Sequence, residues 1–332
     1  MSRIVKFRSK PTVSGSAAVG GGKEMAGALG EYFDLCDTTD AFGKDTFEKS
    51  ESEMQRVALA LALKKSGVSP DKLDAAFAGD LMNQCTGSSY GLASFCAPYF
   101  GLYGACSTAA EGLILGAIAI ESGCFKTVAT VSSSHNSSAE RQFRFPLEYG
   151  SQRPPTAQWT ATASGAFVLK AEEKGEVYIN EALPGRIVDK GITDQNNMGA
   201  AMAPAAASTL YEYFAESGEE PDSFDMILTG DLGYEGNSIC RELLSTKGLR
   251  FGKNFSDCGI LLYDRERQDT HSGGSGCGCS ASVTAGYVMQ RFRKGEIKDV
   301  LLVGTGALMS PSSVLQGLSI AGIGHLVRLT RR

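Results

Sequence analysis

The stretch Gly104-Ala-Cys-Ser-Thr108 determines the expected fold, because a similar stretch, Gly276-Cys-Gly-Cys-Ser280, follows later in the chain. Each consists of small residues, carries cysteine, and precedes a segment of roughly 15 residues that predicts a helix. The residues before the first stretch, Phe100-Gly-Leu-Tyr-Gly104, predict a strand that runs into it. Cys106 is therefore expected on a strand-to-helix turn, called here the cysteine turn (residues 104–108).

Two further pairs of similar segments flank these turns in the same order. Asp74-Ala-Ala-Phe-Ala-Gly-Asp-Leu81 resembles Asp225-Met-Ile-Leu-Thr-Gly-Asp-Leu232, and each predicts a buried strand that ends at a Gly-Asp turn. Gly123-Cys-Phe-Lys-Thr-Val128 resembles Gly295-Glu-Ile-Lys-Asp-Val300, and each predicts a helix end followed by a strand. Matches in one order indicate a duplicated α/β unit. We expect an N-terminal half over residues 1–172, which carries the cysteine turn, and a C-terminal half over residues 173–332.

Other elements are predicted around this frame. Ser50-Glu-Ser-Glu53 matches a capping box before a helix that ends near Lys65. A helix is expected over residues 205–217, before the second Gly-Asp strand. Strands are expected over residues 163–169 and within residues 319–329, where each half closes.

Composition, net charge and the length of apolar runs exclude several classes of protein. The 332-residue chain is 42% hydrophobic and 21% charged, which is typical of a packed globular protein. A net charge of −5 gives no general attraction for nucleic acid. The run from Leu113 to Ile120 is the longest apolar stretch, far below the ~20 residues of a membrane span. With no apolar leader and an odd number of cysteines, the sequence predicts a soluble intracellular protein with free thiols.

No metal or cofactor site is expected. Cys277 and Cys279 form a Cys-x-Cys pair, but no second pair completes a four-ligand zinc set. The three histidines, His135, His271 and His325, are scattered along the chain.

Cys106 is the most informative single residue. A thiol at a helix start lies near the positive end of the helix dipole and near free N–H groups, which favours the thiolate. Its small neighbours would let a ligand approach the backbone. The alternative is a buried, inert cysteine, which the sequence leaves open.

Longer stretches indicate a family. The duplicated halves, the cysteine turn and the Gly-Asp turns resemble the thiolase-like fold. From the region of Lys10 to the end, the chain resembles the stage V sporulation protein AD family. The stretches that carry this resemblance are Gly79-Asp-Leu-Met-Asn-Gln84, Ser133-Ser-His-Asn136, Ala139-Glu-Arg-Gln-Phe-Arg-Phe-Pro146, Glu148-Tyr-Gly150, Met202-Ala-Pro-Ala-Ala-Ala207, Leu228-Thr-Gly-Asp-Leu232 and Gly273-Gly-Ser-Gly-Cys277.

The resemblance implies a five-layered α/β/α/β/α sandwich built from two halves, and the homodimer that thiolase-like proteins commonly form. It implies binding of dipicolinic acid (pyridine-2,6-dicarboxylate), alone or with calcium. It further implies support for uptake of this acid into the developing spore, and for its release in germination, with integral membrane proteins of the same system. The expected location is cytoplasmic, at the spore inner membrane through those partners.

Catalysis is not expected, because the chain departs from the enzymes of the fold. They pair the cysteine with a histidine and with a second cysteine, histidine or asparagine from the C-terminal half. The corresponding loops here hold Gly230-Asp231, Gly273-Gly-Ser-Gly-Cys277 and Gly304-Thr-Gly-Ala307. We therefore predict a binding protein. The alternative is an acyltransferase, or an enzyme that processes acyl-thioesters through Cys106.

A planar dicarboxylate calls for forked cationic donors and a flat apolar wall. Residues 135–153 follow a predicted strand and supply polar groups interleaved with Phe143, Phe145 and Tyr149. The predicted ligand-binding residues are Cys106, His135, Asn136, Arg141, Gln142, Arg144, Gln152, Ser275 and Cys277, with Arg153 beside them. The alternative is a surface loop whose arginines are neutralised by Glu140 and Glu148. Asp80 and Asp231 are expected to cap the helices that follow them.

The sequence offers three other interpretations. Gly87-Ser-Ser-Tyr-Gly91 fits a serine hydrolase motif, but that motif needs a strand directly before it, and the predicted strand ends at Gly79. Gly20-Gly-Gly-Lys-Glu24 lacks the spacing of a phosphate-binding loop and is interpreted as a flexible N-terminal segment. The third is a structural adaptor with an empty cleft.

Overall fold

The computed structural model describes residues 2–143, 152–171 and 175–331. One hydrogen-bonded sheet runs through it in the order β11-β10-β13-β14-β9-β2-β8-β6-β4-β5. The N-terminal strands are β2 (Thr12–Gly21), β8 (Ala163–Lys170), β6 (Thr127–Ser134), β4 (Ala75–Gly79) and β5 (Tyr99–Gly101). The C-terminal strands are β9 (Val177–Leu183), β14 (Ala321–Arg331), β13 (Asp299–Leu308), β10 (Met226–Thr229) and β11 (Phe255–Asp257).

Both sets of strands follow one pattern. β8 is antiparallel to β2 and β6, while β6, β4 and β5 are parallel. In the same way β14 is antiparallel to β9 and β13, while β13, β10 and β11 are parallel. The two sets meet where Thr12 of β2 pairs with Tyr178 of β9. The repeated order agrees with the predicted duplication. The predicted boundary at residues 172 and 173 touches residues outside the described part and stays a prediction.

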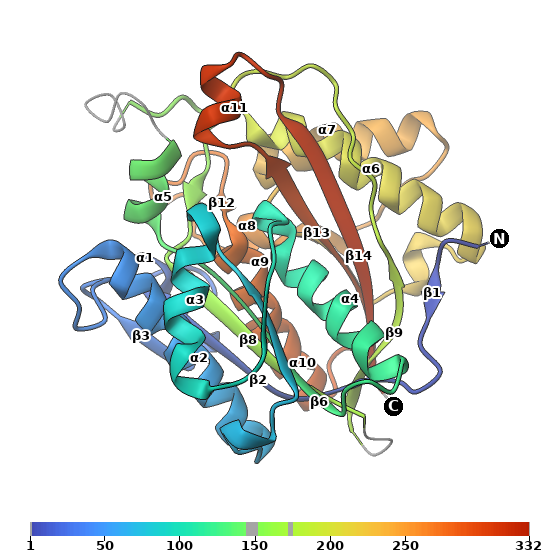
Figure 1. Cartoon of the computed structure of the whole chain (residues 1–332). Helices are drawn as coiled ribbons and strands as arrows, with labels where there is room; N and C mark the ends of the chain where they lie inside the picture. The colour runs from blue at the N-terminus through green and yellow to red at the C-terminus, as the bar shows by residue number, and fades with distance from the viewer. Residues whose placement is uncertain (1, 144–151, 172–174, 332) are drawn as a thin grey trace.

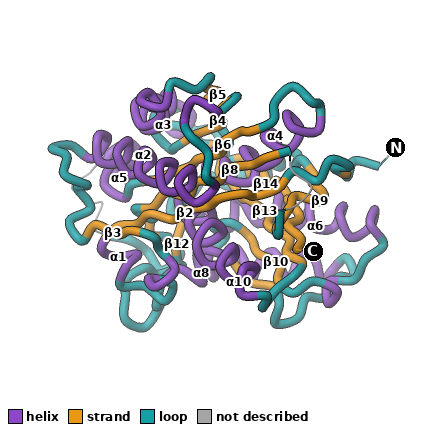
Figure 2. Tube along the Cα trace, turned by 90° about the horizontal axis from the view of Figure 1, so that it is seen from below, coloured by secondary structure: helices purple, strands orange, loops and turns teal. Residues whose placement is uncertain are grey.

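Helices form three layers around the two sets of strands (Figures 1 and 2). The middle layer holds α4 (Thr108–Glu121) and the helical segment α9 (Cys277–Val283), η8 (Thr284–Val288) and α10 (Met289–Lys294). α2 (Phe47–Ser66) and α3 (Thr86–Leu92) cover one outer face, and α6 (Met198–Ser217) and α7 (Gly233–Thr246) cover the other. Three apolar clusters fill the spaces between layers. α4 is apolar almost all round, as a helix buried between sheets should be.

The predicted strands are present, but two helix starts were predicted wrongly. α2 begins at Phe47, before the proposed capping box, and Thr46 caps it by accepting a hydrogen bond from Lys49 N at 3.3 Å. Ser50 lies inside the helix. α6 begins at Met198, seven residues before the predicted start, and contains Pro204. A proline normally marks a helix boundary, because it lacks the N–H of an interior residue.

Shorter elements complete the fold. The glycines interpreted as a flexible N-terminal segment are ordered, because they end β2 and begin α1; that interpretation was wrong. The remaining strands and α-helices are β1 (Val5–Lys6), α1 (Gly22–Met25), β3 (Leu35–Asp37), α5 (Asn136–Phe143), β7 (Trp159–Thr160), α8 (Cys258–Leu262), β12 (Gly274–Ser275) and α11 (Pro311–Leu315). Across the described ranges, no helix has the length and apolarity needed to cross a membrane.

Candidate functional site

The cysteine turn lies between strand β5 and helix α4, as predicted. Ala105 has a φ of +50°, a left-handed conformation that is strained for a residue with a Cβ. A short 3-10 turn, η5 (Ala105–Ser107), then leads into α4. Cys106 is only 5% exposed, and that exposed part faces a pocket. The turn therefore presents the sulfur at a pocket floor rather than on an open surface.

The predicted thiolate character of Cys106 is wrong. Burial raises the pKa of the Cys106 thiol well above its ordinary value, and the neighbouring Asp231 carboxylate raises it further. The thiol and this carboxylate are close neighbours in the buried interior. Loss of water and a nearby negative group outweigh the helix dipole, so the sulfur stays protonated at neutral pH.

None of the three histidines, all within the described ranges, hydrogen-bonds to Cys106. Their ring nitrogens have other partners: His135 donates to Asp40 O at 3.0 Å, His271 donates to Pro154 O at 2.8 Å, and His325 accepts from Gly185 N at 3.1 Å. The proton shuttle that would activate a cysteine is therefore not assembled by these side chains.

Asp231 joins three segments behind the cysteine turn. Its carboxylate accepts hydrogen bonds from Ser275 Oγ at 2.9 Å, Gly276 N at 3.0 Å and Thr305 Oγ1 at 2.7 Å. Burial raises the pKa of the Asp231 carboxyl group, and these donors partly offset that effect. Asp231 thus connects the end of β10 to the start of α9 and to β13.

Asp231 does not cap the helix after it, so that prediction was wrong. The first amides of that helix, Leu232 N and Gly233 N, donate instead to Asp257 at 2.8 and 3.1 Å. Asp257 also accepts from Gly259 N at 2.9 Å at the start of α8. One buried carboxylate at the end of β11 therefore serves two helix starts, a role that the spacing of the residues did not reveal.

Two glycines of β13 let this strand lie against the cysteine turn. A Cβ on Gly306 would come within 2.5 Å of Gly104 O, and a Cβ on Gly304 within 2.6 Å of Ala110 Cβ. The small residues of this loop therefore serve close packing.

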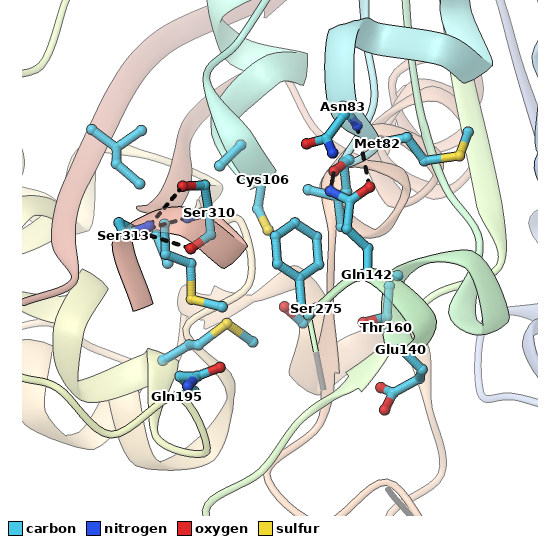
Figure 3. A pocket seen from close by; sticks show the side chains of 18 of the residues that line it. Met82, Asn83, Cys106, Glu140, Gln142, Thr160, Gln195, Ser275, Ser310 and Ser313 are labelled. Atoms are coloured by element: carbon cyan, nitrogen blue, oxygen red, sulfur yellow. Dashed lines mark hydrogen bonds between the residues drawn. The ribbon is translucent and has the colours of Figure 1, made fainter. Parts of the chain in front are cut away.

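A pocket of about 850 Å³ opens beside Cys106 (Figure 3). Cys106 and Ser275 lie between Ser310 and Ser313 on one side and Gln142 and Asn83 on the other. The described lining comes from both halves and consists of Asp80, Leu81, Met82, Asn83, Gln84, Tyr103, Ala105, Cys106, Ala139, Glu140, Gln142, Phe143, Gln152, Thr160, Thr193, Asp194, Gln195, Asn196, Met198, Ser275, Ala307, Leu308, Met309, Ser310 and Ser313.

Four of the predicted ligand-binding residues line this pocket: Cys106, Gln142, Gln152 and Ser275. Gln142 is held in place because its Nε2 donates to Leu81 O at 2.8 Å, and its Oε1 accepts from Asn83 N at 3.2 Å. Their role in binding a ligand stays a prediction.

The other predicted residues lie elsewhere. His135 is buried behind the strand end, Asn136 Nδ2 donates to Thr160 O at 3.2 Å, and Cys277 Sγ donates to Ala105 O at 3.0 Å. Arg141 pairs with Glu48 at the surface. Arg144, with Phe145, Glu148 and Tyr149, lies outside the described residues.

The pocket lining does not carry the cationic side chains that we expected for a dicarboxylate ligand. The described lining contains no Lys, Arg or His, whereas it contains the acidic residues Asp80, Glu140 and Asp194. Two long helices, α4 and α6, begin at the pocket near Cys106 and Met198, and a helix start carries partial positive charge. Nor do the described residues include any group of three or more His, Cys, Asp or Glu that could hold a metal ion.

Comparison with known proteins identifies the family. The family model of stage V sporulation protein AD matches residues 1–330. The chain belongs to this family. Stage V sporulation protein AD of Bacillus subtilis (strain 168) is 38% identical over 319 residues, which cover 96% of this chain and 94% of that protein. The resemblance found in the sequence is thereby confirmed.

Solved structures show the fold. 3-Oxoacyl-[acyl-carrier-protein] synthase III from Aquifex aeolicus VF5 matches with a TM-score of 0.59 and 14% identity, over 96% of this chain and 99% of that one. Cerulenin-bound OleA from Xanthomonas campestris matches with a TM-score of 0.62 and 12% identity, over 98% of each chain. At such low identity the likeness concerns the fold alone, and it confirms the predicted thiolase-like architecture.

Proposed function

We propose that this protein binds dipicolinate in the pocket beside Cys106. In this proposal it supports uptake of the acid into the developing spore, and its release in germination, together with membrane-embedded sporulation proteins. The observation that carries the proposal is a pocket at the starts of α4 and α6, in a chain that belongs to a sporulation family. Helix starts offer partial positive charge and free N–H groups to an anion.

The lining suits a small planar aromatic acid. Tyr103 and Phe143 supply ring faces, and amides and hydroxyls such as Gln142, Gln195 and Ser310 supply neutral donors. Ligand pockets commonly combine an apolar wall with a few such polar groups. The acidic residues favour one further form of the ligand, the calcium chelate, because calcium prefers oxygen ligands and neutralises the dianion. Calorimetric titration with and without calcium compares the affinity for free dipicolinate with the affinity for its calcium chelate.

Binding rather than turnover is proposed because of the state of Cys106. An acyl transfer through this residue needs a thiolate and a partner that carries protons. The Cys106 thiol is buried, burial and the neighbouring Asp231 raise its pKa, and none of the three histidines hydrogen-bonds to it. The site geometry therefore favours a non-catalytic pocket on an enzyme's scaffold.

A bulky substitution at the pocket wall tests the proposed site. Gln195 lines the pocket and forms part of the loop before α6. Gln195→Trp should place an indole in the pocket and lower dipicolinate affinity by roughly 10- to 100-fold, because steric overlap removes contacts with both walls. Isothermal titration calorimetry of the purified protein measures this change.

Lys190→Trp is the matched control, because Lys190 is an exposed residue of the same loop that does not line the pocket. It should bind dipicolinate like the native protein. Equal affinities for both variants would move the ligand out of this pocket. Failure of the native protein to bind dipicolinate, with or without calcium, would remove the proposed function. Spores that carry Gln195→Trp should contain less dipicolinate than those that carry Lys190→Trp.

We also propose a homodimer through β5, the last strand of the sheet. Along its outer edge the described residues place no further strand, and residues 97–105 contain no charged side chain. Four aromatic residues on or beside it are exposed, which are Tyr90, Tyr99, Phe100 and Tyr103. An uncharged open edge with exposed rings favours pairing with a second copy about a two-fold axis, because it lacks the charges that block edge-to-edge contact.

Sedimentation velocity tests the dimer. The native protein should sediment at about twice the chain mass of 35.0 kDa, and Tyr99→Glu should sediment as a monomer, because it places a charge on the paired edge. Ile187→Glu, at an exposed apolar residue outside this edge, serves as the control and should stay dimeric. A native monomer at all concentrations would contradict the dimer.

A further inference from the structure

Two buried carboxylates, those of Asp80 and Glu51, lie at and behind the pocket wall. Asp80 follows β4, lines the pocket and is 6% exposed. Its carboxylate accepts hydrogen bonds from Met82 N at 2.9 Å, Ser88 N at 2.7 Å and Ser88 Oγ at 2.6 Å. Glu51 of α2 is 1% exposed and lies behind it. A surface glutamate would be expected at this helix position, so its burial needs a reason.

A chain of polar side chains connects the two carboxylates. Gln55 Nε2 donates to Ser88 Oγ at 2.9 Å and to Ser133 Oγ at 2.7 Å. Ser133 Oγ donates in turn to Glu51 Oε1 at 2.8 Å. Gln55 Oε1 is buried and has no partner among the described residues. The pocket wall is thus linked through hydroxyl and amide groups to an acid in the interior.

No cation compensates this pair within the described surroundings. The nearby basic groups pair with other acids at the surface, Arg56 with Glu53 and Arg141 with Glu48. The other titratable groups that interact with the pair are Cys85, Tyr99, His135 and Cys277. Burial lowers the pKa of His135 and raises the pKa values of Cys85, Tyr99 and Cys277, so that these four groups stay neutral near pH 7.

Two uncompensated buried carboxylates cannot both be charged without a large cost. Burial, and then the charge of Asp80, raises the pKa of Glu51, and burial raises the pKa of Asp80. Near neutral pH the pair therefore holds a proton. A further negative charge in the pocket would lie beside Asp80 and would favour a second proton.

We propose that an anion entering the pocket drives a proton from solvent onto the Asp80–Glu51 pair, so that ligand binding is linked to proton uptake. The inference rests on the proposed function, because it takes the dipicolinate dianion as the ligand. Its consequence is pH-dependent binding. Affinity should fall by up to about tenfold for each unit of pH increase where the pair loses its protons, because binding then takes up about one proton.

Isothermal titration calorimetry measures the protons directly. Dipicolinate is titrated near neutral pH in two buffers of different ionisation enthalpy, and the difference in apparent enthalpy gives the protons taken up. Dipicolinate is already a dianion at this pH, so its own titration contributes nothing. The native protein should take up between about half a proton and one proton per ligand. The neutral calcium chelate should cause a smaller uptake.

Two variants assign the proton to the pair. Asp80→Asn removes the carboxylate at the pocket wall. Glu51→Gln removes its partner without touching the pocket, so it tests the proposal even where Asp80→Asn disturbs the wall. Each should lower the uptake at least twofold, and the double variant should abolish it. The matched control is Glu53→Gln, an acid on the same helix that pairs with Arg56 away from the pocket, and its uptake should equal that of the native protein.

The outcomes separate this inference from the proposed function. Binding with proton uptake that the double variant abolishes supports the linkage. Binding without proton uptake overturns the linkage and leaves the proposed function in place. Native uptake in the double variant also overturns it. Absence of binding at every pH removes the proposed function and, with it, this inference. Circular dichroism of each variant shows whether the fold is retained.

Discussion

Asp231→Ala is expected to lower the free energy of unfolding by roughly 3–5 kcal/mol. The substitution leaves three buried donors without their acceptor, which are the Ser275 hydroxyl, the Gly276 amide and the Thr305 hydroxyl. Each buried donor that loses its partner costs about 1–3 kcal/mol, and only partial rearrangement is available in a packed interior. Urea denaturation followed by circular dichroism at neutral pH measures the loss.

Asp231→Asn separates hydrogen bonding from charge. Its Oδ1 can still accept from part of the donor set, so the loss should be smaller, about 1–2 kcal/mol. Asp222→Ala, at an exposed residue of the same half, is the control and should change stability by less than about 0.5 kcal/mol. A loss below 1 kcal/mol for Asp231→Ala would show that these hydrogen bonds do not organise the site.

The architecture was predictable from local patterns, because those patterns reflect the environment of single elements. The buried strands β4 and β10 are apolar runs that end at Gly-Asp turns, and each recurs at the same place in its half. The cysteine turn was recognisable because small residues are needed where a strand bends into a helix. The repetition of these segments in one order then indicated two halves of the same pattern.

The state of Cys106 was not predictable, because distant segments produce it. A helix start favours a thiolate when the thiol is open to water. Here β13 packs against the cysteine turn through Gly306, and Asp231 approaches from the end of β10. These residues are more than a hundred positions away in the chain. Local sequence gives the position of the sulfur, whereas tertiary contacts give its protonation.

Buried acids were missed for the same reason. Ser50-Glu-Ser-Glu53 has the pattern of a polar helix start, and this pattern gives no sign that Glu51 is buried. Its partners Ser133 and Ser138 lie 82 and 87 residues further along the chain.

The arginines of residues 135–153 were predicted at the ligand, and the structure places the described ones elsewhere. Arg141 and Arg153 were expected to face a ligand, yet both pair with acids, Glu48 and Asp269. A cation in a loop rich in acids more often finds a local partner than a ligand.

Stability should also fall as pH rises from about 5 to about 9, because several carboxyl groups are buried in their protonated form. Glu24 is fully buried, and burial raises its pKa from 4.5 to about 7. Thr162 N donates to its Oε1 at 3.0 Å, and the Tyr263 hydroxyl donates to the same oxygen. Burial likewise raises the pKa of Asp257 to about 7. Both groups therefore lower the free energy of unfolding as pH rises.

The sign follows from proton binding. Between pH 4.5 and about 7, the folded protein holds a proton on Glu24 that the unfolded chain has lost. The stabilisation is therefore complete below pH 4.5 and is lost as pH rises through about 7. For Glu24 this loss amounts to about 3 kcal/mol, from a shift of roughly two to three pKa units. Unfolding free energies from urea denaturation at pH 5 and pH 9 measure the difference.

Glu24→Gln should reduce that pH dependence by about 3 kcal/mol, because the amide cannot ionise and can still accept from Thr162 and Tyr263. Glu31→Gln, at an exposed residue close in the chain, should keep the native pH dependence. If Glu24→Gln and the native protein lose equal stability between pH 5 and pH 9, the proton is not on Glu24. The dependence would then belong to the other buried acids with raised pKa values, among them Asp257, Asp231 and the Asp80–Glu51 pair. The double variant Glu24→Gln/Glu51→Gln measures the contribution of Glu51 separately from that of Glu24. The two contributions should add, since Glu51 and Glu24 share no hydrogen-bond partner.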